Sequence, residues 1–137
     1  EMCIRDRINA AVQMGAAAAG ADADQCRALE AYAYGIGLVF QIVDDVLDVT
    51  STPEQLGKPI GSDSENGKTT FATLYGVEGA MALAQRVNEK TCSALRETFG
   101  EKSAFLAEAS FRFLWDLDAR CPRSWPHARF RANEIAK

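Results

Sequence analysis

The segment from Asp24 to Val49 most constrains the fold, because it is long, mostly apolar and has the residue period of a helix. Asp22 or Asp24 can cap its start, and Pro53 follows its end and cannot continue a helix. No segment of the chain shows the sustained alternation of apolar and polar residues that a half-buried strand requires. The sequence therefore predicts an all-α protein, either a helical bundle or part of one.

Shorter periodic segments predict further helices on both sides of this one. They are expected at Ile8–Ala19, from Thr69 or Thr70 to Gly76, at Glu78–Phe99 and at Lys102–Ala119. Gly20 and Gly100 are natural stops for two of them, because glycine readily adopts the left-handed conformation at a helix end. The last helix carries one apolar side, expected to comprise Leu106, Ala109, Phe113 and Leu117.

Four polar residues recur at helical spacing near the end of the long segment. They are Gln41, Asp44, Asp45 and Asp48, which share one face of a helix. The three carboxylates repel one another, and the sequence has no Lys or Arg between Arg27 and Lys58 to compensate them. A Mg²⁺ ion is the natural partner, since it prefers oxygen ligands and bridges carboxylates to phosphates. A solvated acidic helix end is the alternative.

The segment from Ser51 to Lys68 is rich in Gly and Pro and is predicted to be a loop. It contains two Gly-Lys pairs, Gly57-Lys58 and Gly67-Lys68. Glycine lets a backbone approach an anion closely, and lysine supplies a point charge for phosphate. Neither pair has the spacing of a P-loop. Together with the aspartates, the two lysines indicate a site for a metal ion and a diphosphate.

Composition argues against several classes of function. The net charge of −4 over 137 residues argues against a nucleic-acid partner. No apolar run reaches the ~18 residues of a membrane span, and the N-terminus shows no signal-peptide pattern, so a cytoplasmic location is expected. The four cysteines form no CxxC pair, which favours reduced thiols over a zinc site or a disulfide scaffold.

The stretches GLVFQIVDDVLDV, LGKPIGSDSENGKTT and LYGVEGA resemble the C-terminal half of trans-prenyl diphosphate synthases of the farnesyl and geranylgeranyl type. The resemblance implies a helical bundle of the isoprenoid synthase type, which joins an allylic diphosphate to isopentenyl diphosphate. It further implies that Asp44 is a direct Mg²⁺ ligand and that Asp45 and Asp48 act directly or through water. Gln41, Lys58 and Lys68 would contact the allylic diphosphate or its metal shell. All three aspartates are thus expected catalytic residues.

The chain departs from the family pattern at both ends. Residues 1–7 do not match, residues 8–120 resemble the C-terminal part of the synthase domain, and residues 121–137 are expected to form an irregular tail. The first aspartate-rich motif and the residues that hold isopentenyl diphosphate are absent. We therefore expect a fragment that is inactive alone, from a parent that forms a homodimer. A non-catalytic regulatory subunit is the alternative. A terpene cyclase ranks last, because the paired Gly-Lys loop fits the chain-elongating enzymes better.

Overall fold

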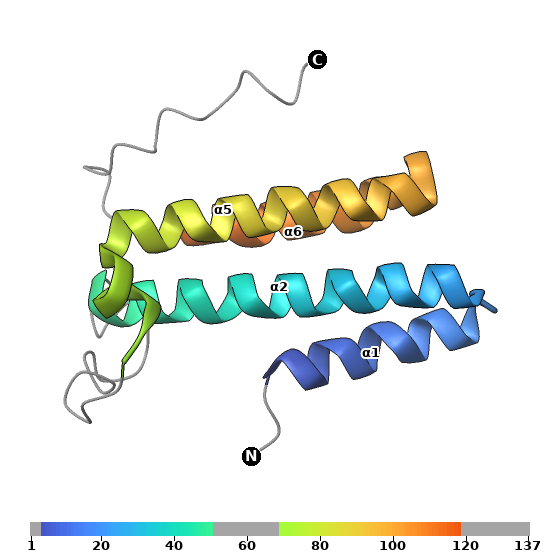
Figure 1. Cartoon of the computed structure of the whole chain (residues 1–137), viewed down its shortest axis with the longest axis horizontal. Helices are drawn as coiled ribbons and strands as arrows, with labels where there is room; N and C mark the ends of the chain where they lie inside the picture. Colours follow the sequence, from blue (N-terminus) through green and yellow to red (C-terminus); the bar gives the residue numbers. More distant parts are fainter. Residues whose placement is uncertain (1–3, 51–68, 119–137) are drawn as a thin grey trace.

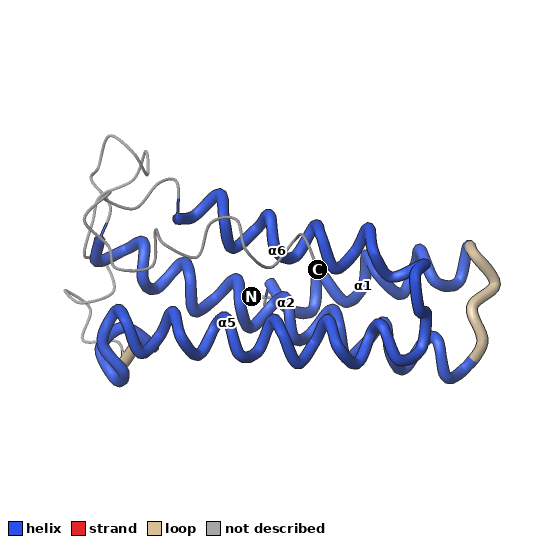
Figure 2. The backbone as a smooth tube through the Cα atoms, turned by 90° about the horizontal axis from the view of Figure 1, so that it is seen from above, coloured by secondary structure: helices blue, strands red, loops and turns tan. Residues whose placement is uncertain are grey.

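The structure, a computed structural model, describes residues 4–50 and 69–118. These residues form α1 (Ile4–Ala18), α2 (Ala23–Thr50), α5 (Phe71–Phe99), the 3-10 helix η1 (Gly100–Ser103) and α6 (Ala104–Asp118). The two described ranges contain no strand, which confirms the all-α prediction. Helix α2 lies between α1 and α5 (Figure 1), and the long helices run side by side when seen from above (Figure 2).

Local hydrogen bonds explain the sharp reversal between α1 and α2. At the end of α1, Gly20 has a φ of 68° and the amide of Ala21 donates to the carbonyl of Ala16 over 3.0 Å. At the start of α2, the Gln25 amide donates to Asp22 Oδ1 over 2.9 Å, and the Asp22 amide donates to Gln25 Oε1 over 3.0 Å. Asp22, rather than Asp24, is therefore the residue that caps α2.

Helix α5 begins with a short segment that is offset from the rest. Thr70 caps it, because the Thr73 amide donates to Thr70 Oγ1 over 3.2 Å and the Thr70 amide donates to Thr73 Oγ1 over 2.9 Å. Gly76 then interrupts the helix with a φ of 68° and a ψ of 169°. The short helix expected to end at Gly76 is thus confirmed, and it lies across the end of α2 (Figure 1).

The main core is formed where α2 packs on α5, with a smaller contribution from α6. Its buried residues are Val39, Ile42, Val43, Val46 and Leu47 of α2, Ala72, Ala80, Met81 and Ala84 of α5, and Leu114 of α6. These α2 residues lie on the side of the helix that the polar positions leave apolar. Burial of this side fixes the rotation of α2 about its axis.

Two glycines, Gly35 and Gly37, let α2 approach its neighbours closely. A Cβ placed on Gly35 would overlap Thr91 of α5, and a Cβ on Gly37 would lie 2.6 Å from Arg5 Cγ and 3.0 Å from Arg5 Cα of α1. A side chain at either position would push the helices apart. Gly35 and Gly37 therefore serve the packing on opposite sides of α2.

The apolar side predicted for the last helix is wrong at Ala109, which is exposed. Among the residues of η1 and α6 whose side chains the structure describes, the buried ones are Ser103, Ala107, Ser110 and Leu114, while Leu106 is half-buried. The Ser103 hydroxyl donates to the Gly100 carbonyl, and the Ser110 hydroxyl to the Ala107 carbonyl. These bonds satisfy the hydroxyls, so small polar residues can lie in the interface. The side chains of Phe113 and Leu117 lie outside the described part of the chain.

A buried polar cluster joins α2, α5 and α6. Cys92 Sγ lies 3.1 Å from Ser110 Oγ, and Asn88 of the preceding turn is fully buried. The Tyr32 hydroxyl donates to the Leu106 carbonyl over 2.9 Å. Burial raises the pKa of Tyr32 to about 12, and the neighbouring Cys92 acts in the same direction. The cluster fixes where α6 docks on the α2–α5 pair.

Two further expectations concern cysteines and membranes. Cys26 and Cys92 form no disulfide, and Cys3 and Cys121 lie outside the described residues. Within residues 4–50 and 69–118, none of the helices has the combination of length and hydropathy that a bilayer span needs.

Candidate active site

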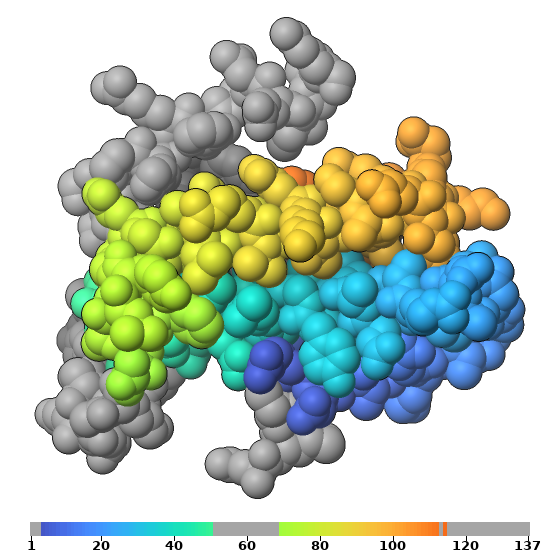
Figure 3. Space-filling model, in the orientation of Figure 1, coloured from blue at the N-terminus to red at the C-terminus, as the bar shows by residue number. Residues whose placement is uncertain are grey.

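The carboxylate-bearing part of α2 borders a cavity of about 430 Å³. The cavity is lined by Ile4 of α1, by Phe40, Gln41, Asp44 and Asp45 of α2, and by Phe71 of α5. Figure 3 shows α2 at the surface between the start of α1 and the start of α5. One side of the cavity is therefore polar, whereas the phenylalanine and isoleucine side chains make the other side apolar.

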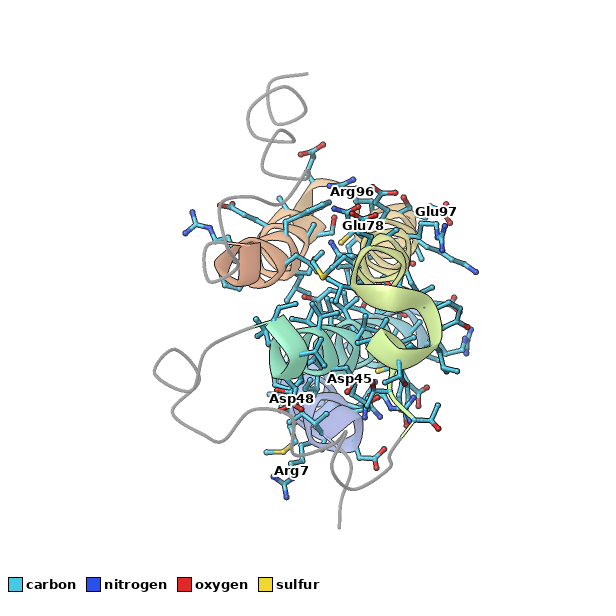
Figure 4. The ribbon with its side chains drawn as sticks, turned by 90° about the vertical axis from the view of Figure 1, so that its left-hand side faces the viewer. Arg7, Asp45, Asp48, Glu78, Arg96 and Glu97 are labelled. Atoms are coloured by element: carbon cyan, nitrogen blue, oxygen red, sulfur yellow. The ribbon has the colours of Figure 1, made fainter. Side chains whose placement is uncertain are left out.

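The four polar residues of the predicted face differ in their exposure. Asp44 is exposed, Gln41 and Asp45 are half-buried, and Asp48 is only 4% exposed. Three of them line the cavity, and Asp48 does not. Asp45 and Asp48, which Figure 4 labels, lie on the side of α2 that faces α1. Helical spacing thus brings the four residues to one side of α2, but only three of them border the cavity.

Asp48 combines burial with an unsatisfied oxygen. Its Oδ2 atom is buried and has no hydrogen-bond partner within the described part of the chain. A buried carboxylate oxygen costs free energy when it contacts neither a hydrogen-bond donor nor a cation. Asp48 Oδ2 is therefore suited to bind a cation or to accept a hydrogen bond. Sequence periodicity placed Asp48 on the polar face but gave no indication that it would be buried.

Asp45 has a partner on another helix. Its Oδ2 atom accepts a hydrogen bond of 2.8 Å from the backbone amide of Phe71, the first residue of α5. The carboxylate therefore joins α2 to the start of α5 across 26 residues of sequence. This contact was not predicted from the sequence, because backbone amides carry no residue-specific signal.

The carboxylates of α2 do not form a closed metal cage. Among residues 4–50 and 69–118, no group of three or more His, Cys, Asp or Glu side chains is arranged to hold a metal ion. The reason is visible in the directions of the side chains, since Asp44 is exposed, Asp45 contacts α5 and Asp48 is buried. Carboxylate oxygens nevertheless match the ligand preference of Mg²⁺, which commonly takes one or two protein carboxylates and completes its shell with water and phosphate.

Two of the predicted site residues, Lys58 and Lys68, lie outside the described part of the chain. The structure in turn adds residues that the sequence did not single out for the site. Ile4 and Phe71 line the cavity from two different helices. A signal for Ile4 was present, because it precedes Ile8 by one helical turn, and α1 indeed begins at Ile4 rather than at Ile8.

Comparison with known proteins gives consistent results. The polyprenyl synthetase family model matches residues 6–108. The chain is 47% identical over 81 residues to geranylgeranyl pyrophosphate synthase 10 (mitochondrial) of Arabidopsis thaliana, covering 59% of this chain and 24% of that protein. It is 39% identical over 107 residues to farnesyl diphosphate synthase of Geobacillus stearothermophilus, covering 78% of this chain and 30% of that protein.

A third relative is geranylgeranyl diphosphate synthase of Cyanophora paradoxa, 45% identical over 83 residues, with 61% of this chain and 28% of that protein covered. The chain thus spans less than a third of the length of these relatives. The family model covers most of the chain, including all of α2 and all of α5. Together with the all-α structure, these matches show that the chain belongs to the polyprenyl synthetase family.

Proposed function

We propose that the chain is part of a Mg²⁺-dependent prenyltransferase, which condenses an allylic diphosphate with isopentenyl diphosphate in isoprenoid biosynthesis. The cavity beside α2 is the observation that carries this proposal. Gln41, Asp44 and Asp45 line one side of it, and Phe40 and Phe71 contribute apolar surface. A prenyl diphosphate has this dual character, because a highly charged head is joined to a hydrocarbon chain.

Each polar residue has a proposed role. Asp44, which is exposed at the cavity, is proposed as a direct Mg²⁺ ligand. Asp48 offers a buried oxygen without a partner, so it fits a role toward the ion either directly or through water. Gln41, Lys58 and Lys68 are proposed to contact the diphosphate or its metal shell, with the two lysines outside the described residues.

The proposed chemistry follows from charge. Cleavage of the allylic C–O bond releases diphosphate and leaves an allylic cation. A bound Mg²⁺ ion would stabilise the charge that develops on the leaving group, and the lysines would add to this effect. The double bond of isopentenyl diphosphate attacks the cation, and loss of a proton completes the reaction. The phenylalanines of the cavity would keep water away from the cation.

The activity is proposed for a longer protein, because the chain spans less than a third of its relatives. We propose that residues 8–120 are the part of the synthase domain in this chain, flanked by residues 1–7 and 121–137, and that the intact parent is a homodimer. A cytoplasmic location stays a prediction, since the relatives include proteins named mitochondrial and chloroplastic.

A non-catalytic subunit of a prenyl diphosphate synthase is the second candidate. The observation in its favour is that the described carboxylates of the site all come from one helix, α2. Such a subunit could bind Mg²⁺ and diphosphate without turnover. It would need a partner chain to supply the facing wall of the site.

The first test uses the chain itself. Binding of Mg²⁺ and inorganic pyrophosphate is measured by isothermal titration calorimetry for the wild type, Asp44→Asn and Glu89→Gln. Glu89 is the matched control, because it is an exposed carboxylate on α5 that does not line the cavity. We expect Asp44→Asn to weaken Mg²⁺-dependent pyrophosphate binding at least about tenfold and Glu89→Gln to leave it unchanged. Equal binding by all three proteins would count against the site.

The second test addresses catalysis. Residues 6–108 replace the matching segment of the Geobacillus stearothermophilus farnesyl diphosphate synthase, and transfer of labelled isopentenyl diphosphate is assayed. A prenyltransferase segment should support turnover, and Asp44→Asn should lower it by about 100-fold or more. A folded but inactive chimera, together with Mg²⁺-dependent pyrophosphate binding by the 137-residue chain, would favour the non-catalytic subunit.

A further inference from the structure

We propose that Asp45 is a positioning residue, which anchors the start of α5 to α2 and thereby places one wall of the cavity, rather than a direct ligand of the metal ion. This inference rests on the proposed function for its meaning in catalysis. Its structural part concerns a contact within the chain and can be tested separately.

The hydrogen bond to Asp45 satisfies a backbone amide at the start of α5. Phe71 is the first residue of α5, so its amide has no acceptor within the helix. Thr70 caps the helix, but its hydroxyl oxygen accepts from the amide of Thr73, not from that of Phe71. Asp45 Oδ2 accepts from the Phe71 amide over 2.8 Å. A carboxylate in this place also interacts favourably with the positive end of the helix dipole.

Asp44 and Asp45 are neighbours on α2, but their side chains lie in different surroundings. Successive residues of a helix point in directions about 100° apart. Asp44 is accordingly exposed, whereas Asp45 is half-buried and turned toward Phe71. The oxygen of Asp45 that contacts α5 is committed to a neutral backbone donor. The exposure of Asp44 at the cavity is the observation that favours it over Asp45 as the direct ligand.

The anchor matters because the start of α5 is held weakly by its own helix. Gly76 breaks the helical conformation, so residues 71–75 form little more than one turn of their own. Only one residue of this segment, Ala72, is buried. The hydrogen bond from Phe71 to Asp45 ties the segment to α2.

Phe71 carries the effect of the anchor into the cavity. Its side chain lines the cavity and stacks on Tyr75, with ring centroids 6.5 Å apart and an interplanar angle of 18°. The position of this ring depends on where the Phe71 backbone is held. Asp45 therefore acts on a bound ligand through Phe71.

The anchor is tested by the exchange rate of the Phe71 amide hydrogen, followed by NMR in the 137-residue chain and its variants. Asp45→Ala removes the acceptor, whereas Asp45→Asn keeps an oxygen that can accept from the Phe71 amide. We expect Asp45→Ala to speed exchange about tenfold or more and Asp45→Asn to restore most of the protection. Unchanged exchange in Asp45→Ala, or no recovery in Asp45→Asn, would overturn the anchor.

The division of roles is tested by Mg²⁺-dependent binding of inorganic pyrophosphate to the same variants. A positioning role predicts that Asp45→Asn binds at least about tenfold more tightly than Asp44→Asn, because the anchoring oxygen is retained. Equal losses in Asp44→Asn and Asp45→Asn would make Asp45 a ligand and overturn the inference. No loss in Asp44→Asn would instead contradict the proposed function, and the amide exchange of Phe71 would then decide the anchor alone.

Discussion

The close approach of α2 and α5 at Gly35 makes a prediction whose size follows from the structure. In Gly35→Ala, the new Cβ would overlap Thr91 Oγ1 and lie 2.8 Å from Thr91 Cγ2 and 3.0 Å from Thr91 Cβ. Thr is branched at Cβ, so rotation about χ1 exchanges one overlapping atom for another. The strain cannot be relieved by the side chain alone, and the two helices must move apart.

Two opposing effects set the magnitude. Alanine in place of a helical glycine favours folding by about 1 kcal/mol. Overpacking a close helix contact costs about 1–3 kcal/mol and sometimes more, and a clash that a rotamer change cannot relieve belongs at the upper end. We therefore expect Gly35→Ala to lower the free energy of unfolding by about 2 kcal/mol.

Gly15→Ala provides the matched control, because a Cβ on Gly15 of α1 would meet nothing within 4 Å. It should raise the free energy of unfolding by about 0.5–1 kcal/mol. Both variants are compared by urea unfolding, followed by circular dichroism. The double variant Gly35→Ala/Thr91→Gly should recover the loss, with a coupling energy of up to about 3 kcal/mol, because the clash is then absent. A stabilising Gly35→Ala, or strictly additive effects in the double variant, would refute the packing argument.

Three further predictions concern burial and capping. Because the pKa of Tyr32 is raised from 10.0 to about 12, its contribution to stability is complete below pH 10 and is lost as the pH rises toward 12. The free energy of unfolding should fall by at most about 3 kcal/mol over this range in the wild type and by less in Tyr32→Phe. Equal alkaline losses in both proteins would contradict this prediction. Asp48→Asn should stabilise the Mg²⁺-free chain by roughly 1 kcal/mol, because it removes a buried charge. The same substitution should reduce the rise in melting temperature that Mg²⁺ and pyrophosphate cause. A variant that is less stable than the wild type in calorimetry would contradict the burial argument. Asp22→Ala should lower the free energy of unfolding by about 1 kcal/mol in the same urea assay, whereas Asp24→Ala should change it by less than about 0.5 kcal/mol. Equal effects of the two substitutions would contradict the assignment of Asp22 as the cap of α2.

The sequence predicted those features of the fold that depend on local interactions. The extent of α2, its start near Asp22 and the stops at Gly20 and Gly100 follow from helical period and capping chemistry. The break at Gly76 was likewise predicted, because glycine is the residue that best adopts a positive φ. The predicted side of the last helix was wrong at Ala109, because the helix packs through Ser110 and other small residues, and a search for apolar periodicity does not detect buried serines.

What the sequence by itself determined at the site is the grouping of the polar residues. Helical spacing places Asp44, Asp45 and Asp48 on one side of α2 whatever the rest of the chain does. Only the tertiary structure decided that Asp48 is buried and that Asp45 binds the amide of Phe71. Burial and backbone partners depend on segments distant in the sequence, since α5 meets α2 only when both pack into one core. Spacing along one helix therefore specifies a shared face, and packing between helices gives each carboxylate on that face a different environment.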